Sequence, residues 1–535
     1  MIRQFFTIFL PVKIKKVFKS PLVRALLVFF FFCTIFGYAQ FAHEGLYGSD
    51  AYYHAKHSQI VYESGKFSVV KPWIAFHFFS TLPADPYVLH HFITGQVNRF
   101  LGPVNSLKLV SALQATLIFL FFYLIAWKKL KEHNFLLTLL FFLSSTIFSF
   151  RILLGRPFVI SIALMIAGFY LLSKKRYVWA FFFSVLYILM YNFIAPFLLL
   201  SLLFSISIYY EKKIVDLRPI ISVFGGVLLG LILHPQTIGY THVILVHTFE
   251  IFYLKLAGIT LPSGSELATM SFSTIMLGNI ITVTLFLFFS SLALYLHSEK
   301  KLDGDSFVLL TFCSLSLVAT VLVPRMVEYW VPMTFLLSVY VFVQASKYDV
   351  FKVINNQSKR RKNIPTLLIL AILTFFCSKN LVIFYNNIAV GDLEKKKEFY
   401  EATDELSSIV SKGKTVFLTN WSSFAPLFFE NSDIQYIAGF DPVFMYNYDQ
   451  HLYWTWYNLI LRGLYCPQRE ACMDLSTMHQ INAVQHAVHN IFESDYIFSS
   501  KTSPLSENFR NFVSHRPNDF EIVFENDGYI IIRVK

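Results

Sequence analysis

The chain has 535 residues, of which 55% are apolar, 18% aromatic and only 15% charged. A soluble globular domain carries about 25% charged residues, so this composition excludes an ordinary soluble protein. The net charge of +12 could suggest nucleic-acid binding. Lys and Arg lie in short segments between apolar runs, however, so we expect a membrane protein with no nucleic-acid partner.

Apolar runs that are long enough to cross a bilayer recur along the first 386 residues. About 18 apolar residues span about 30 Å of hydrocarbon as a helix, which satisfies its own backbone hydrogen bonds. We therefore expect an α-helical polytopic membrane protein with about 11 transmembrane helices. For the first run, a cleaved signal peptide over 1–42 is the alternative. The predicted spans are 21–40, 104–127, 134–150, 157–172, 177–191, 193–210, 218–234, 273–296, 306–323, 329–346 and 365–386.

Basic clusters occupy every second loop of this arrangement, among them "WKKLKEH", "SKKRY", "YEKKIVDLR" and "SEKK". Because cytoplasmic loops are rich in Lys and Arg, these loops and the N-terminus are predicted to be cytoplasmic. The domain 1–386 then has two long outside loops, 41–103 and 235–272. We expect the protein to be integral to the cell (inner) membrane, with an extracytoplasmic domain over 387–535.

The segment 387–535 is more polar, and its acidic residues outnumber its basic ones. The segments "KTVFLTN", "IQYIAG", "DYIFSS", "FEIVFEN" and "YIIIRVK" are predicted to be strands that alternate with helices, which indicates a small α/β domain. Trp421 follows the first strand, where α/β domains bind ligands; docking on the membrane helices is the alternative. Cys466 and Cys472 form a disulfide or remain two free thiols.

The stretch "GLYGSDAYYHAKHSQIVYESGKF" follows the first span and places Asp50 and His54 one helical turn apart. We expect a helix capped by Ser49 or Asp50 that ends at Gly65. Ionisable groups at the membrane boundary are costly unless they are used. Asp50 is therefore a candidate general base or metal ligand, with His54 orienting it; a capping role alone is the alternative.

A second polar cluster in the same loop contains Asp85, His90 and His91. His91 lies six residues after Asp85, so in a simple helix His90 would be the nearer of the two histidines. The cluster is a candidate to support catalysis. The alternative is a helix cap with interfacial histidines.

Arginines occur in two outside turns, against the general charge bias. Arg151 and Arg156 bracket the turn "FRILLGRP", and Arg325 begins the turn "PRMVEYW". Guanidinium groups bind phosphate oxygens in a bidentate manner. We expect phosphate binding, with lipid-headgroup contacts as the alternative for the first pair. Glu328 is a candidate substrate contact or an i,i+3 partner of Arg325.

These features together resemble the GT-C superfamily of polyprenyl-phosphate-dependent glycosyltransferases. The layout is most similar to the catalytic subunit of oligosaccharyltransferase. The resemblance implies that Asp50 of "SDAYYH" is catalytic and that Arg325 of "RMVEYWVP" binds the lipid (pyro)phosphate. It also implies that Glu266 of "SGSE" positions the acceptor and that Trp421 of "NWSSF" matches the family's W-W-D-Y-G stretch.

The chain also departs from that family. The turn "RILLGRPF" holds no carboxylate where the family has a second acidic motif. The resemblance therefore gives no support for a bound divalent metal (Mg or Mn). The resemblance implies transfer of a sugar from a polyprenyl (pyro)phosphate donor to an extracytoplasmic acceptor. We expect Asp50 to act as general base, supported by His54 or by the cluster of Asp85 and His91. The alternatives are en bloc oligosaccharyl transfer to protein and a non-enzymatic glycan transporter or scaffold.

Overall fold

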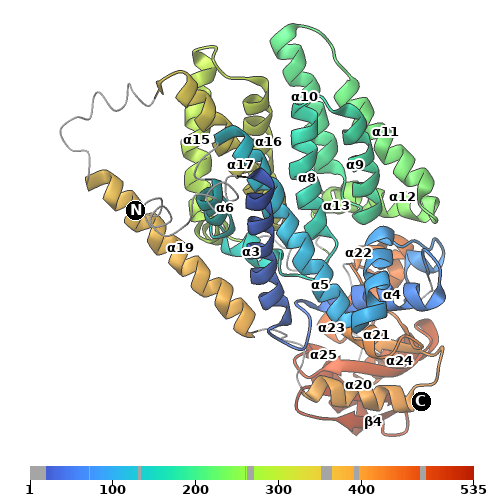
Figure 1. The fold of residues 1–535 in the computed structure, drawn as a ribbon. Coiled ribbons are helices and arrows are strands. Elements are labelled where there is room, and N and C mark those ends of the chain that lie inside the picture. Colours follow the sequence, from blue (N-terminus) through green and yellow to red (C-terminus); the bar gives the residue numbers. More distant parts are fainter. Residues whose placement is uncertain are drawn as a thin grey trace.

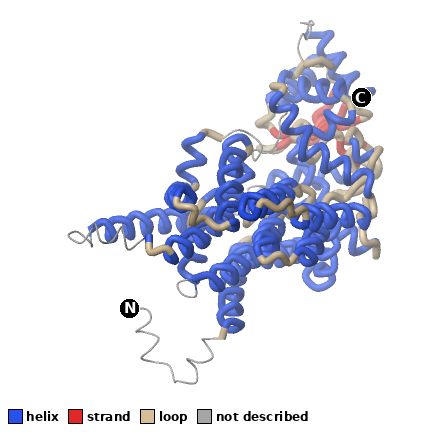
Figure 2. Tube along the Cα trace, turned by 90° about the horizontal axis from the view of Figure 1, so that it is seen from above, coloured by secondary structure: helices blue, strands red, loops and turns tan. Residues whose placement is uncertain are grey.

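The fold was analysed in a computed structural model, which describes residues 20–70, 73–130, 134–259, 261, 270–350, 364–390, 397–469 and 477–535. A bundle of apolar helices forms one end of the molecule and a small α/β domain forms the other (Figure 1). Seen from above, the strands are confined to the region beside the C-terminus, and the rest of the described chain is almost entirely helical (Figure 2).

Helices cover all eleven segments that the sequence predicts to cross the membrane. They are α3 (Pro21–Phe41), α5 (Val88–Leu130), α6 (Asn134–Phe142), α7 (Thr146–Arg151), α8 (Phe158–Ser173), α9 (Tyr177–Met190), α10 (Ala195–Lys212), α11 (Arg218–Leu233), α14 (Phe272–Gly278), α15 (Ile280–Ser298), α16 (Gly304–Leu322), α17 (Val327–Lys347) and α19 (Ile364–Val390). Among the described residues, five helical segments are long and apolar enough to cross a membrane. The count of eleven spans is therefore not confirmed.

Two predicted spans are each broken into two helices. The run 134–150 is divided between α6 and α7, where Ser145 caps α7 by accepting a hydrogen bond from the backbone of Phe148. The run 273–296 is divided at Asn279, between α14 and α15. The Ser145 hydroxyl donates to the Asn279 side chain, so the two breaks lie together and satisfy each other's polar groups.

The first outside loop contributes α4 (Ser49–Ser64), the 3₁₀ turn η1 (Phe78–Ser80) and the first part of α5. Helix α5 has non-helical backbone at Gly102, directly before Pro103. His90 lies 3.0 Å from Gln114, although 24 residues of straight helix would separate them by about 36 Å. The segment before Gly102 therefore folds back on the span that follows it. This agrees with the prediction that the loop ends, and the span begins, near residue 103.

Helices α4 and α5 approach closely at Gly95. A Cβ atom at this position would lie 2.8 Å from the backbone oxygen of Ser58, a distance that no side chain tolerates. The absence of a side chain lets the two helices meet, and this contact brings the histidines of both helices together. The second outside loop adds α12 (Thr237–Leu245), the π-helical turn η2 (Val246–Glu250) and α13 (Ile251–Leu256).

The α/β domain is built on one five-stranded sheet. Its strand order is β2-β1-β3-β5-β4, with β1 parallel to β2 and β3, and β5 antiparallel to β3 and β4. The strands are β1 (Thr415–Leu418), β2 (Gln435–Tyr436), β3 (Ser494–Ser500), β4 (Phe520–Glu525) and β5 (Tyr529–Val534); the helical segments are α20 (Lys397–Ile409), η4 (Trp421–Ser423), α21 (Phe424–Glu430), α22 (Val443–Tyr448), α23 (Gln450–Arg462), α24 (Thr477–His486), η5 (Ala487–Ile491) and α25 (Pro504–His515). All five predicted strands are confirmed.

The first outside loop joins this sheet at its β2 edge. The backbone of Tyr436 donates to Trp73 at 2.9 Å, and the backbone of Ala75 donates to Tyr436 at 2.9 Å. This bridge fixes the loop between α4 and α5 to the α/β domain. Cys466 is disulfide-bonded and Cys33, Cys313 and Cys377 are free thiols; Cys472 lies outside the described residues.

A buried ion pair joins two distant helices in the bundle. Arg151, at the end of α7, pairs with Glu328, in the first turn of α17. The two side chains are 9% and 0% exposed, and the guanidinium also lies over the ring of Phe158. Glu328 therefore has a cationic partner from a distant helix, Arg151.

We expect Arg151→Met alone to destabilise the protein, because it leaves the Glu328 carboxylate buried without its cation. Breaking a buried pair costs about 3–5 kcal/mol, whereas replacing both members by apolar residues is often neutral. Arg151→Met combined with Glu328→Leu should therefore recover much of the lost stability. Thermal unfolding in detergent measures both variants. Equal losses in the single and double variants would contradict a specific pair.

Candidate active site

A cavity lies where the bundle meets the α/β domain. It encloses about 890 Å³ of empty space, part of it open to solvent. Three groups of residues line it. The first outside loop and α4 supply Asp50, Tyr53, His54, Phe79, Pro86 and Tyr87; the bundle and second outside loop supply Arg156, Pro157, Phe158, Tyr191, His247, Ile251 and Arg325; the α/β domain supplies Trp421, Phe440, Asp441 and Phe444. The sequence predictions of Asp50, His54, Arg156, Arg325 and Trp421 thus converge on one cavity.

Asp50 reaches this cavity from the first turn of α4. The helix begins at Ser49, and the N-cap residue is Gly48, which has a φ of 81° and makes no side-chain capping hydrogen bond. The predicted capping by Ser49 or Asp50 is therefore wrong. A Cβ atom at Gly48 would lie 3.1 Å from Leu154, which shows how closely α4 begins against the turn before α8. Asp50 is free to face that turn, and its Oδ2 lies 3.1 Å from Nη2 of Arg156.

Two guanidinium groups face the cavity from separate turns. Arg156 precedes α8, and Arg325 lies in the 3₁₀ turn η3 (Pro324–Met326) before α17. Arg325 donates to the hydroxyl of Tyr191 and lies over the ring of Phe193. Two planar cations of this kind suit a phosphate group. Arg151 and Glu328 do not line the cavity, because they are paired with each other.

The α/β domain contributes an aromatic wall. Trp421 follows β1, and Phe440, Asp441 and Phe444 follow β2, so the cavity lies at the carboxyl ends of parallel strands as expected. A smaller hollow beside Asp50 and His54 is also lined by Trp421 and Phe440. The apolar faces of sugar rings pack well on such aromatic surfaces.

The second outside loop completes the cavity. His247 lies in the π-helical turn η2 and interacts with Asn192 at 2.6 Å. Glu250 accepts from Asn447 of α22 at 2.9 Å, and Asn447 also contacts His242 at 2.7 Å. These contacts join the loop to the α/β domain. Glu266, which the resemblance assigned to acceptor binding, lies outside the described residues.

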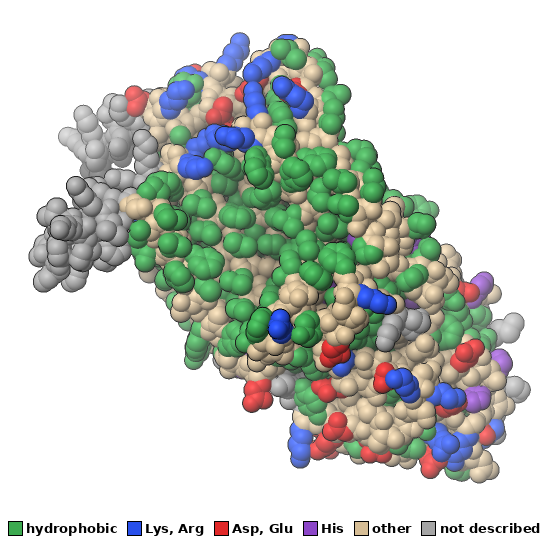
Figure 3. All heavy atoms as spheres, turned by 45° about the vertical axis from the view of Figure 1, so that its right-hand side comes forward, with side chains coloured by type: hydrophobic (Ala, Val, Ile, Leu, Met, Phe, Trp, Pro, Cys, Tyr) green, Lys and Arg blue, Asp and Glu red, His purple; other side chains and the backbone are tan. Residues whose placement is uncertain are grey.

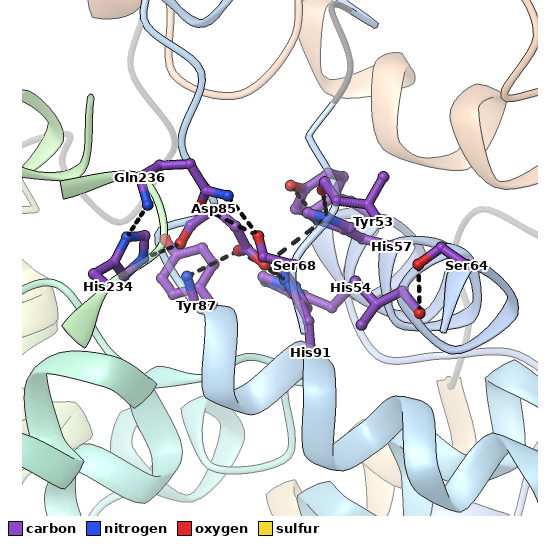
Figure 4. Close-up of polar contacts among 12 residues, drawn as sticks. Tyr53, His54, His57, Ser64, Ser68, Asp85, Tyr87, His91, His234 and Gln236 are labelled. Atoms are coloured by element: carbon purple, nitrogen blue, oxygen red, sulfur yellow. Dashed lines mark hydrogen bonds and ion pairs between the residues drawn. The ribbon is translucent and has the colours of Figure 1, made fainter. Parts of the chain in front are cut away.

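Behind the cavity, Asp85 is the centre of a buried polar cluster (Figure 4). His91 Nδ1 donates to the Asp85 carboxylate at 2.8 Å, and the backbone of Tyr87 donates to it at 3.0 Å. His57 Nε2 lies 3.8 Å from the same carboxylate. His91, and not His90, contacts Asp85: Asp85 precedes the start of α5, so helical spacing does not apply between them.

The cluster extends to the cavity through a second histidine. His91 Nε2 lies 2.8 Å from His54 Nδ1, and His54 lines the cavity. His57 contacts the Tyr53 hydroxyl at 2.7 Å and the Val69 carbonyl at 2.7 Å. Since a carbonyl only accepts, His57 Nε2 carries the proton and Tyr53 donates to Nδ1.

Burial and charge determine the ionisation of this cluster. Burial opposes ionisation of Asp85, but the neighbouring His91 and His57 rings and the hydrogen bonds from His91 and Tyr87 outweigh it and hold the pKa of Asp85 below its usual range. Burial lowers the pKa of His57 to about 4, and burial together with the neighbouring histidines and Arg156 lowers the pKa of His54 well below its usual value. Near neutral pH, Asp85 is therefore a carboxylate, and His54 and His57 are neutral.

His57, Asp85 and His91 each offer a donor atom, and these atoms lie within 4.8 Å of one another. A cation site would need lone pairs on the nitrogens that face the carboxylate. His57 Nε2 donates to Val69 and His91 Nδ1 donates to Asp85, so both of these nitrogens carry protons. The arrangement is that of a hydrogen-bonded carboxylate, and it does not fit a metal.

Several residues of the cavity were not predicted from sequence. Tyr87, Tyr191 and His247 all lie at helix ends or in loops beside the cavity, but nothing in their local pattern separates them from other aromatic residues and histidines near helix ends. Phe440 and Asp441 follow a predicted strand. Their place after that strand was the signal that could have identified them.

Neither a protein-family model nor a curated protein matches this chain. Solved structures do. The oligosaccharyltransferase of Archaeoglobus fulgidus in its apo form aligns over 89% of this chain and 69% of its own, with 11% identity and a TM-score of 0.57.

Other solved structures extend the comparison. ArnT from Cupriavidus metallidurans bound to undecaprenyl phosphate aligns over 95% of this chain and 97% of its own, with 10% identity and a TM-score of 0.55. A second archaeal structure, AglB from A. fulgidus with an inhibitory peptide and a dolichol-phosphate, gives a TM-score of 0.58 at 11% identity. At such identities the likeness concerns the fold alone: this chain shares the fold of these oligosaccharyltransferase and ArnT structures, and the resemblance found in the sequence is confirmed at the level of the fold.

Proposed function

We propose that this protein transfers a sugar from a polyprenyl phosphate or pyrophosphate donor to an acceptor on the outer side of the membrane. One observation carries the proposal: Asp50, Arg156 and Arg325, from three distant segments, line one cavity between the membrane helices and the α/β domain. The lipid tail of such a donor stays in the bilayer while its sugar meets an acceptor in water. Chemistry on it has to take place at this boundary.

The distribution of charge supports this orientation. On the face shown in Figure 3, hydrophobic side chains cover the middle of the helical part, Lys and Arg gather at the end opposite the α/β domain, and mixed charges cover the α/β domain. The basic end contains the turns after α8, α10 and α15, with Lys174, Lys213 and Lys300. Because basic loops favour the cytoplasm, the cavity and the α/β domain are assigned to the opposite side.

The proposed step is a displacement at the sugar's anomeric carbon. Arg325 and Arg156 bind the phosphate and stabilise the charge that develops on it as the bond to the sugar breaks. Asp50 receives the hydrogen bond of the acceptor hydroxyl or amide and draws its proton away as the new bond forms. Trp421 and Phe440 provide an apolar surface for the sugar. The complexes of ArnT with undecaprenyl phosphate and of AglB with a dolichol-phosphate support a lipid phosphate as the ligand.

We expect Asp50→Asn to lower transfer at least 10²-fold, because general-base catalysis contributes about 10²–10⁴-fold. Cells that lack the gene should accumulate a polyprenyl-linked sugar and lose one surface glycan, and mass spectrometry of both fractions detects this. The intact gene should restore the glycan and Asp50→Asn should not. Asp433→Asn, at an exposed site of the α/β domain, is the matched control. Full restoration by Asp50→Asn would remove Asp50 from the mechanism.

Arg325→Ala should weaken binding of undecaprenyl phosphate to the purified protein by about 10-fold or more, because hydrogen bonds to charged groups contribute about 1.5–3 kcal/mol. Native mass spectrometry in detergent measures the bound fraction. Arg510→Ala, which removes an exposed arginine paired with Glu525, should leave binding unchanged. Equal binding by the two variants would show that Arg325 does not hold the phosphate.

A further inference from the structure

A chain of hydrogen bonds runs from the cavity to the buried Asp85 carboxylate. His54 lines the cavity. Its Nδ1 lies 2.8 Å from Nε2 of His91, and Nδ1 of His91 lies 2.8 Å from the Asp85 carboxylate. We propose that His54, His91 and Asp85 form a proton relay, which takes the proton of the acceptor group out of the cavity and stores it between His91 and Asp85. The relay rests on the proposed glycosyl transfer and assigns the destination of its proton.

The hydrogen-bond partners determine the tautomers along this chain. The ionised Asp85 carboxylate only accepts, so His91 Nδ1 carries a proton. Neutral His91 then has its lone pair on Nε2, and the 2.8 Å contact requires His54 Nδ1 to donate. The ring nitrogen of His54 that remains is Nε2, which has a lone pair. His54 is thus prepared to accept a proton from the cavity side.

His54 cannot keep that proton. Its ring is buried, and Arg156, His57, His90 and His91 oppose a positive charge on it. A proton that arrives at Nε2 is stabilised only if His54 passes its Nδ1 proton to His91. The resulting imidazolium of His91 then lies directly against the Asp85 carboxylate, which is where a buried positive charge is best compensated.

Asp50 is less suited to be the final acceptor. Its carboxylate is 42% exposed and its Oδ2 lies 3.1 Å from Arg156. An ion-paired carboxylate can orient the acceptor group and draw its proton away as the new bond forms, but keeping that proton would sacrifice the ion pair. His54 follows Asp50 by one helical turn on the same cavity wall, so the proton has a short path from the group that Asp50 orients.

The proposed transfer conserves atoms, electrons and protons without a further reactant. The acceptor's O–H or N–H bond breaks as its electron pair forms the bond to the anomeric carbon, and the sugar–phosphate bond breaks with its electron pair leaving on the phosphate. The proton that Asp50 draws away passes to His54 Nε2, and the Nδ1 proton of His54 moves to His91 Nε2. The relay resets when the proton returns to the cavity and water after the product leaves.

Several other ionisable groups surround the relay and influence its pH dependence. They are Asp50, Tyr53 and His57 of α4, His90 of α5, Tyr87 of the preceding turn and Arg156 of the turn before α8. His57 belongs to the same buried cluster but donates to the Val69 carbonyl, so it lies outside the path. It provides a control that is matched in residue type and burial and that lies 3.8 Å from Asp85.

The first test needs no substrate. Solid-state NMR of the full chain in lipid nanodiscs, with ¹⁵N-labelled histidine and His54→Gln for assignment, reports which ring nitrogens carry protons. At neutral pH we expect His54 with a proton on Nδ1 and a bare Nε2, and His91 with a proton on Nδ1. A proton on His54 Nε2 at neutral pH would overturn the relay and leave the proposed transfer intact.

The second test measures turnover. Washed membranes from cells that lack the gene supply the accumulated lipid-linked donor and acceptor, and purified protein in nanodiscs is added. We expect His91→Gln to lower kcat at least 10²-fold, to leave undecaprenyl phosphate binding unchanged, and to remove the fall in rate toward acidic pH that protonation of the relay causes. His57→Gln should keep kcat within about 3-fold and retain that fall.

The outcomes separate the two proposals. If His91→Gln behaves as His57→Gln does, His91 only supports the structure and the relay is wrong. If the unaltered protein transfers nothing in these membranes and binds no undecaprenyl phosphate, the proposed glycosyl transfer fails, while the NMR result still decides whether the tautomers of a relay exist.

Discussion

This structure depends on one constraint: charged side chains at the boundary between lipid and water need partners of opposite charge, because a buried charge without one is strongly destabilising. The 3.1 Å pair of Asp50 and Arg156 satisfies it at the cavity, and the fully enclosed pair of Arg151 and Glu328 satisfies it within the bundle. The arginines on either side of one turn thus have different partners. Arg151 is neutralised by a buried carboxylate, which joins α7 to α17, and Arg156 faces a partly open cavity where a ligand can compete for it.

The second requirement is that distant segments hold one geometry. The first outside loop forms a backbone bridge to the β2 edge through Trp73 and Tyr436, and the second reaches α22 through Glu250 and Asn447. The α/β domain is therefore fastened to both loops that supply cavity residues. Its aromatic wall and the cationic turns of the bundle keep their spacing because each loop is bound at both sides.

Sequence alone predicted the elements well where composition is decisive. Long apolar runs can only be helices in lipid, and alternating strands and turns indicate a sheet; the segments of both kinds are found where expected. Hydropathy could not detect the breaks at Ser145 and Asn279, since these depend on local caps and on a hydrogen bond between residues 134 positions apart. The pairing of Arg151 with Glu328, 177 positions apart, is invisible to local pattern for the same reason.

Within the site, Asp50 and Arg325 were found because their residue types are unusual at the outer boundary. His90 was expected to lie nearer to Asp85 than His91 does, because helical spacing was applied across a helix start.

The central claim is that one cavity holds a lipid phosphate between Arg325 and Arg156 with Asp50 beside it. An electron cryo-microscopy structure of the protein in nanodiscs with undecaprenyl phosphate tests this most directly. The account predicts phosphate density within hydrogen-bonding distance of the Arg325 guanidinium, with the lipid chain leaving the cavity into the bilayer. Phosphate density at the basic end of the bundle, opposite the α/β domain, with the cavity filled only by water, would contradict it.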